Sequence, residues 1–519
     1  MSIRNAAPVD PVWPDRREDR VSKQWPGSGE NPDGAAPETG RDALKAAIAA
    51  AIEQDARRLT AVGEDIYAHP ELAYHEFRTA DVVARELRRL GLTVEEGLAR
   101  TGVRARLRGR GHGPTVCVLA ELDAIRTPGH PAADPITDAA HSCGHHAQVA
   151  HLVGVAGALT ELVAGELAGD VLFFAVPAEE YSDIDRAGAA DVEFPGGKQE
   201  LIRLGCFDGV DLAMMAHALG TGELSDDGRP PSRAGDGSGP AGALGMTWRY
   251  TGFAIRRAIF RGRAAHASTA PGHGIDALGA ARIALHAIDT QRESFADGVR
   301  VHPVLRAHHG TLNVVADQAA VDVVIRGRTQ ASIVDAGQRV DRALRAGAFA
   351  VGAGVELTTA PGYQPLSVDR TLGGIFRANA VRLAGAGGWS EAEFSAASTD
   401  AGDLSTLLPV LHATHGGCAG VNHSASFRIV DPVQAYVQPA VALAWTVVDL
   451  LGGNADAAHG AVAAYRPRYT RSGYVETLRT LARRRRYPQP SAEPVDAEPV
   501  DAEPGPAYEL DNPLQEARA

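Results

Sequence analysis

Short apolar runs that alternate with helical segments are the feature of this chain that most restricts its fold. Two helices are predicted first, one beginning near Arg41 and one at about Thr79–Leu90. The strand-like runs that follow are Arg104–Leu107, Thr115–Leu122, Val171–Val176 and Leu212–Met215, with helical segments around Gln148–Leu162 and Lys198–Arg203. Such alternation predicts an α/β catalytic domain with helices on both faces of a mixed sheet.

The rhythm changes after a loop rich in Gly, Pro, Ser and Asp at Gly220–Gly245. The elements predicted next are a strand (Ala254–Phe260), a helix (Ile275–Ile288), two strands (Ala307–Ala316 and Ala319–Gly327), a helix (Ser332–Val351) and a last strand (Gly354–Ala360). This order is typical of a ferredoxin-like α+β domain. The α/β pattern then resumes, so we expect the small domain to be inserted into the large one, with a ligand site in the cleft between them.

Five segments follow from this pattern. The N-terminal arm, 1–40, contains ten Pro or Gly residues and no apolar period, so we expect it to be disordered. The catalytic domain comprises 41–244 and 367–455, the inserted lid or dimerisation domain is 245–366, and 456–519 holds a C-terminal helix and a disordered acidic tail with a repeat at Ala492–Pro504.

The charge balance argues against a nucleic-acid partner. The chain has 51 basic and 64 acidic residues, a net charge of 51 − 64 = −13. Residues 491–519 alone hold eight acids and one Arg, so about half of the excess lies in the tail. The run Arg483–Arg486 is interpreted as the solvated end of a helix rather than a nucleic-acid footprint.

The cysteines and the apolar segments indicate a cytoplasmic protein. Four cysteines in 519 residues do not form a disulfide framework. The N-terminus lacks the apolar core of a signal peptide. The most membrane-like stretch, Ala147–Ala164, contains polar residues and is better explained as a buried helix, so no membrane partner is expected.

Metal-ligand residue types stand at the ends of several predicted strands or at the mouth of a helix. They are Asp123 near the end of the run Val116–Ala124, Cys143, His145 and His146 ahead of an apolar helix, the adjacent pair Glu179 and Glu180 after a Pro turn, His217, and His423 after a Gly-rich turn. Ligands bind beyond the carboxyl ends of strands in open α/β sheets. Thiolate, imidazole and carboxylate together suit a divalent ion such as zinc or manganese, and a second carboxylate supplies a general base.

Each signal has a plainer explanation when taken alone. Asp123 fits a helix or loop cap equally well, and two adjacent acids on a loop are usually only solvated. A lone His such as His217 on an apolar run is more often a core residue than a ligand. The order in which these residues occur along the chain is what makes them reinforce one another.

Together, these motifs resemble those of the dinuclear metallo-amidohydrolases that include aminoacylases, auxin-conjugate hydrolases and p-aminobenzoyl-glutamate hydrolase. The resemblance covers roughly residues 41–455. The matching motifs, in the family's order, are His69-Pro-Glu-Leu, Glu121-Leu-Asp-Ala, Cys143-Gly-His, Pro177-Ala-Glu-Glu, Ala264-Ala-His-Ala and Ser398-Thr-Asp-Ala-Gly-Asp.

The resemblance implies a role for each site residue. Two divalent metal ions, zinc or manganese, would be held by Cys143, His145, Glu180, His217 and His423. Glu179 would be the general base, and His266 would stabilise the oxyanion in the active site of a partner subunit. Asn313 and Arg326 would grip a substrate carboxylate. An inserted domain with its own sheet also suggests a homodimer formed through that domain.

The chain departs from the family pattern beside the ligands. The residue after the motif's His is normally Asp or Asn and is His146 here, and a position that is His in one branch is Gln148. His146 could be an extra ligand, a hydrogen-bond donor to a ligand, or a sign of altered activity; Asp123 is also expected to lie next to the ligands. The loop Gly220–Gly245 is longer than usual.

The resulting hypothesis is metal-dependent hydrolysis of the amide bond of an N-acyl or N-aryl amino acid or a dipeptide-like substrate. The alternative is a catalytically altered relative that binds metal or an amino-acid conjugate without turnover. A third class, a scaffold acting through its tails, explains the terminal segments but not the metal-type residues.

Overall fold

The computed structural model describes residues 40–163, 165–180, 192–220 and 242–489. The predicted N-terminal arm, the acidic tail and most of the loop Gly220–Gly245 lie outside the described residues. The chain divides into two compact units, Met1–Ala43 and Leu44–Ala519, and both of its large sheets belong to the second.

An eight-stranded mixed sheet forms the larger body of the second unit. Its strand order is β1-β2-β6-β3-β7-β14-β8-β13. The strands are β1 (Val94–Leu98), β2 (Gly102–Leu107), β3 (Thr115–Glu121), β6 (Asp170–Val176), β7 (Leu212–Ala218), β8 (Leu244–Thr247), β13 (Trp389–Ala392) and β14 (Val410–His415). The run β6-β3-β7-β14 is parallel, while β1, β2 and β6 pair antiparallel. Every residue of β3 is buried, as expected for a central parallel strand covered on both faces.

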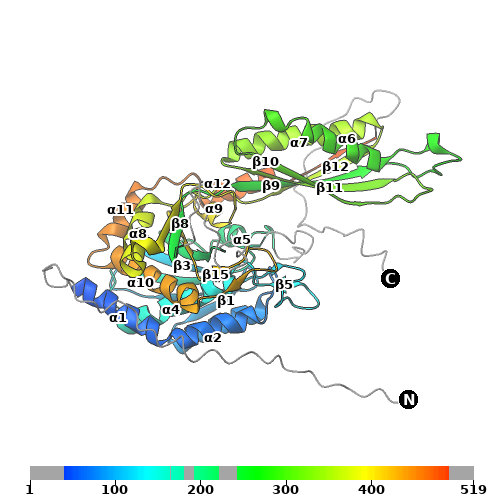
Figure 1. The fold of residues 1–519 in the computed structure, drawn as a ribbon. Helices are drawn as coiled ribbons and strands as arrows, with labels where there is room; N and C mark the ends of the chain where they lie inside the picture. Colours follow the sequence, from blue (N-terminus) through cyan, green and yellow to red (C-terminus); the bar gives the residue numbers. More distant parts are fainter. Residues whose placement is uncertain (1–39, 164, 181–191, 221–241, 490–519) are drawn as a thin grey trace, which may run out of the picture. The chain divides into compact units, whose positions relative to one another are not determined.

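Helices pack around this sheet (Figure 1). The helices are α1 (Gly40–Gln54), α2 (Ala56–Tyr67), α3 (Phe77–Arg89), α4 (His145–Leu162), α5 (Gly197–Arg203), α8 (Arg370–Ala384), α9 (Ala401–Leu404), α10 (Gln438–Leu451), α11 (Asp456–Ala464) and α12 (Arg471–Leu481). Helix α4 is apolar on nearly all sides and packs against β3, β6, β7, α2 and α10. A helix apolar all round belongs in a core, so α4 holds its first residues rigidly.

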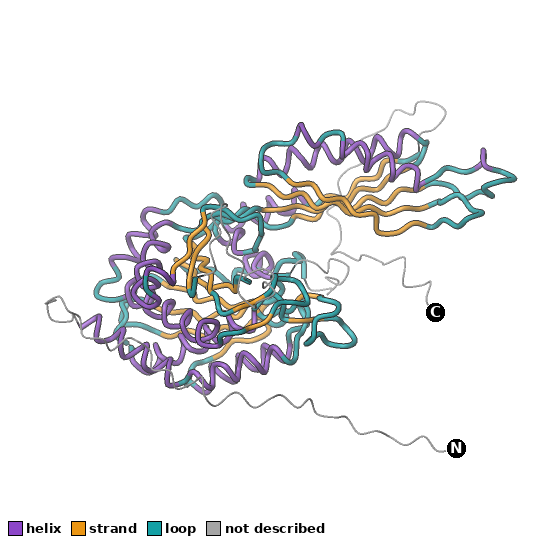
Figure 2. The backbone as a smooth tube through the Cα atoms, viewed as in Figure 1, coloured by secondary structure: helices purple, strands orange, loops and turns teal. Residues whose placement is uncertain are grey.

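A separate five-stranded antiparallel sheet has the order β10-β11-β9-β12-β17. Its elements are β9 (Gly252–Arg261), α6 (Ala277–Asp289), β10 (Arg300–His308), β11 (Gln318–Gly327), α7 (Gln330–Ala350), β12 (Gly354–Pro361) and β17 (Arg483–Tyr487). Figure 2 shows its two helices on one face of the sheet, and the residues between them form a second apolar core. The predicted α/β fold with a mixed sheet is thus confirmed, whereas the role of the smaller sheet as an inserted lid or dimerisation domain stays a prediction.

Two element predictions were wrong. The strand expected at Ala307–Ala316 is β10 at Arg300–His308, an edge strand whose Pro303 and charged residues hide the alternation that a strand normally shows. The helix end expected at Arg483–Arg486 is β17, which pairs with β12 about 125 residues earlier in the chain. A local pattern cannot reveal such a distant partner.

Of the described helices, no single one has both the length and the apolar composition that a membrane crossing needs. One bent pair, Val433–Leu451 with Asp456–Ala464, meets that requirement by length and composition alone.

Candidate metal centre

The turn into α4 carries two of the predicted ligands, Cys143 and His145. Gly144 between them has φ of +86°, and a Cβ there would stand 2.3 Å from the Cβ of Ala218, so glycine is required. The turn directs Cys143 toward the end of β7, where its Sγ lies 3.4 Å from Nε2 of His217.

Glu180 and His423 approach the same thiol. Nε2 of His423 lies 3.1 Å from Sγ of Cys143 and 3.0 Å from Oε1 of Glu180. Glu180 follows β6 through Ala178, which has a positive φ of 51°. His423 also has a positive φ, 64°, and its backbone N–H donates to the carbonyl of Ser142 at 2.9 Å. Both backbones are therefore bent to bring the side chains together.

The predicted ligands form two overlapping groups that share Cys143. One group is Cys143, His145 and His217, and the other is Cys143, Glu180 and His423. Within each group the ligand atoms all lie within 4.8 Å of one another. Cys143 would therefore be available to a cation in either group.

The electrostatics of these groups favour bound cations. Burial raises the pKa of the Cys143 thiol well above its usual value, and the carboxylates of Glu180 and Glu179 raise it further. Burial and the nearby carboxylates of Glu121 and Glu180 likewise raise the pKa of Glu179. The buried Nε2 of His145 lies 3.2 Å from Oε2 of Glu121 without forming a hydrogen bond. Buried acidic groups that ionise readily only beside a cation, together with an unused imidazole nitrogen, fit two divalent cations.

Asp123 lies directly behind two of the ligands. The Nδ1 atom of His145 is 2.8 Å from the Asp123 carbonyl oxygen and 3.2 Å from its Oδ1. The backbone N–H of Glu180 donates to Oδ2 of Asp123 at 2.8 Å. One carboxylate thus orients an imidazole and the backbone of a carboxylate ligand.

His146 points away from both groups. It is fully buried between Tyr67, His141 and Tyr436, with ring centroids 5.1, 5.3 and 6.0 Å away, respectively. Burial keeps its pKa well below the usual value. Among the described residues it joins no cluster of ligand atoms, so the geometry does not support His146 as an extra ligand.

The predicted substrate-binding residues come from strand β11 and from loops next to the smaller sheet. His266 and Asn313 are exposed, and the backbone N–H of Ala267 donates to the Asn313 carbonyl at 2.8 Å. Arg326 donates to Oγ of Ser398 at 2.7 Å. Glu180 raises the pKa of His423, and Arg326 is near enough to offset part of that rise.

A buried ion-pair network behind the ligands was not predicted from the sequence. The Lys198 ammonium is fully buried and donates to Oε1 of Glu121 at 2.6 Å and to Oδ1 of Asp400. Gln148 donates to the other oxygen of Glu121 at 2.7 Å. Glu121 and Asp400 stand inside recognised motifs, which was a usable signal, but the lone Lys198 on a short helix gave none.

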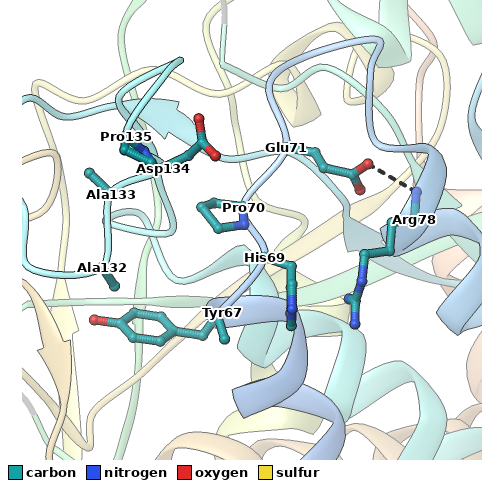
Figure 3. A pocket seen from close by; sticks show the side chains of 10 residues that line it. Tyr67, His69, Pro70, Glu71, Arg78, Ala132, Ala133, Asp134 and Pro135 are labelled. Atoms are coloured by element: carbon teal, nitrogen blue, oxygen red, sulfur yellow. Dashed lines mark hydrogen bonds between the residues drawn. The ribbon is translucent and has the colours of Figure 1, made fainter. Parts of the chain in front are cut away.

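A cavity of about 500 Å³ lies elsewhere, beside the end of α2 (Figure 3). It is lined by residues that include His69, Glu71, Arg78 and Asp134, and none of the predicted ligands lines it. Glu71 accepts hydrogen bonds from the backbone N–H groups of Arg78 and Thr79 at 3.0 and 2.8 Å, so its carboxylate caps the start of α3.

The fold is an α/β fold with a mixed sheet, and two groups of candidate metal ligands share Cys143. No family model matches the chain. A thermostable carboxypeptidase 2 of Saccharolobus solfataricus is 35% identical over 159 residues, 29% of this chain and 37% of that protein. The Xaa-Arg dipeptidase of Mus musculus is 26% identical over 79% of this chain and 89% of its own length. One of the subunits of the p-aminobenzoyl-glutamate hydrolase of Escherichia coli is 29% identical over 53% of this chain and 52% of its length.

A solved structure from Bacillus subtilis, described as a dinuclear metal binding peptidase of the M20 family, has the same fold. It covers 77% of this chain and 99% of its own, with a TM-score of 0.57 and 21% identity. The predicted resemblance to dinuclear metal-dependent amidohydrolases is confirmed by these relatives, all named as hydrolases. This chain spans only 37–38% of the length of the first curated relatives it matches.

Proposed function

We propose that the protein hydrolyses the amide bond of an N-acyl or N-aryl amino acid or of a dipeptide-like substrate. The observation that supports this most is the pair of ligand groups that share Cys143, with Glu179 outside both and in a third group with Glu121 and His145. When bound, two divalent cations would polarise the amide carbonyl and make a water molecule more acidic.

Glu179 is proposed to move the proton. Its Oε2 lies 3.8 Å from Nε2 of His145, so the carboxylate faces the ligand groups. The hydroxyl of Tyr363 donates to the Glu179 carbonyl, which restrains the backbone at this position. A carboxylate held there accepts a proton from the attacking water and returns it to the leaving amine.

Three residues from the smaller sheet and the segments that connect its elements are proposed to bind the substrate. Arg326 and Asn313 would hold its carboxylate, because a guanidinium matches a carboxylate in shape and charge. His266, contributed by a second copy of the chain in a homodimer, would donate to the oxyanion. The exposure of His266 and Asn313 agrees with residues that act only when a partner or substrate is present.

Glu179→Gln tests the base directly. The variant keeps the size of the side chain and should keep the ions of the two groups that contain Cys143, because Glu179 belongs to neither; Glu179 forms a separate group with Glu121 and His145. Turnover should fall below a few per cent. The assay is a hydrolysis screen of N-acyl amino acids, aryl-glutamates and dipeptides, with zinc, manganese or cobalt added back after chelation. More than a few per cent of residual activity would contradict the assignment, and an inactive parent that still binds metal would favour the non-catalytic alternative.

A further inference from the structure

The face of the five-stranded sheet opposite α6 and α7 carries a concentration of arginines. Val321, Val323 and Ile325 of β11 pack into the core beneath the helices, so the alternate residues of each strand face the other way. The cross-strand register places six arginines on that opposite face, here called the arginine face: Arg257 and Arg261 on β9, Arg300 on β10, Arg326 on β11, and Arg484 and Arg486 on β17.

On the described strands, this face has two carboxylates, those of Asp322 and Glu356, against the six arginines. It is therefore strongly positive. Asp322 accepts from Arg257 at 2.8 Å, and Glu356 accepts from Arg484 and from Arg486, the latter at 3.0 Å. Within the described residues, Arg261, Arg300 and Arg326 have no carboxylate partner at all. A local excess of positive charge in a chain of net charge −13 points to an anionic occupant.

We propose that residues 491–519 of the chain dock on the arginine face through charge complementarity. This segment holds eight acids and one Arg and begins four residues after the end of β17, the strand that forms one edge of the same sheet. No other stretch of the chain combines that charge with that starting point.

The segment is long enough to reach every arginine of the face. Glu493, its first acid, is six residues beyond Tyr487, the end of β17, and six extended residues span roughly 20 Å. Strands lie about 4.8 Å apart, so five strands measure roughly 19 Å across. The acids from Glu493 to Glu516 therefore lie within reach of β17, β9 and β10 alike.

Docking of this segment should affect substrate binding through Arg326, a consequence that rests on the proposed function. It belongs to the arginine face and is also the residue proposed to hold the substrate carboxylate. A docked acidic segment would compete with anionic substrates for this guanidinium, so a chain that ends before residue 491 would have a lower KM for them.

Zero-length crosslinking of the full chain tests the docking without any measurement of activity. The chain has only three lysines, Lys23, Lys45 and Lys198, and the last two are buried, so a carbodiimide finds few amines. Arg300→Lys puts a reactive amine on the arginine face and keeps the charge. Arg282→Lys, on the exposed side of α6, is the matched control, and Arg261→Lys is a second variant on the face.

Mass spectrometry then locates the crosslinks. With either face variant we expect intrachain crosslinks from the introduced amine to carboxylates between Glu493 and Glu516, at least tenfold above the Arg282→Lys control. About 1 M salt, which screens charges beyond roughly 3 Å, should abolish them. Equal yields in face and control variants, yields that salt does not change, or crosslinks found only between two chains would each overturn the proposal. Because no substrate is involved, failure here would leave the hydrolytic function unaffected.

Discussion

Replacing Lys198 by Met should destabilise the folded chain by about 3–5 kcal/mol, the usual cost of removing one partner from a buried ion pair. Lys198 is fully buried, and its ammonium is the cation between Glu121 and Asp400. Burial lowers the pKa of Lys198, but the two carboxylates more than reverse that effect and the pKa is raised. Met fills a similar volume, so the loss is mainly that of the charge.

The same substitution should also weaken metal binding. Glu121 lies 3.2 Å from the nitrogen of His145 that faces the ligand groups, and Lys198 holds the far oxygen of that carboxylate. Without the ammonium, Glu121 loses its only described ion-pair partner of the Lys or Arg type and keeps the hydrogen bond from Gln148, so its carboxylate is held less firmly. Urea unfolding followed by circular dichroism measures the stability, and metal analysis after dialysis measures the retained ions.

Two controls separate a charge effect from a packing effect. Lys45→Met removes another buried ammonium, which donates to Asn379 and Asp449 and not to the ligand groups, so it should lower stability and leave the metal content unchanged. The triple variant Lys198→Met, Glu121→Gln, Asp400→Asn removes all three charges and should recover most of the lost stability. If the free energy of unfolding of Lys198→Met lies within about 1 kcal/mol of the parent's, the reasoning from a buried ion pair is wrong.

Three further predictions concern other parts of the chain. Burial raises the pKa of Asp403 from 3.8 to about 8. Between these pH values the folded chain keeps a proton that the unfolded chain releases. The free energy of unfolding should therefore fall as the pH rises from about 4 to about 8. Asp403→Asn should flatten that slope in urea melts at several pH values; a slope equal to the parent's would exclude Asp403 as its cause. His266→Ala should lower kcat by roughly a hundredfold if it donates to the oxyanion, and an unchanged kcat would reduce it to a structural residue. Gly144→Ala should lower the free energy of unfolding by several kcal/mol and release metal, because the new Cβ would stand 2.3 Å from the Cβ of Ala218 and φ at this residue is +86°. If the variant retains as much metal as the parent, the turn can relax.

Local pattern determined much of the larger sheet. The strands β3, β6 and β7 lie where apolar runs predicted them within a few residues, because central parallel strands are buried on both faces and read as continuous apolar stretches. The strands β1 and β13 were not predicted, since both are partly exposed edge strands without such a run. β10 is also an edge strand, and for the same reason its predicted position was wrong.

The candidate ligands could be named from sequence because most of them lie close to one end of an element whose type is locally encoded. How closely these ligands lie in the folded chain could not be predicted from sequence. Cys143 and His423 are 280 residues apart, and only the folded chain brings their side chains to 3.1 Å. The Lys198 network and the pairing of β17 with β12 likewise depend on contacts between distant segments.

By itself, then, the sequence determined the fold class, the residue types of a metal centre and the family that they resemble, since these follow from short-range periodicity and motif order. Only the tertiary structure decided which carboxylate stands beside His145, where His146 points and that β17 pairs with β12 in the smaller sheet. These outcomes are set by packing and by buried charges that must find partners, and neither is encoded locally.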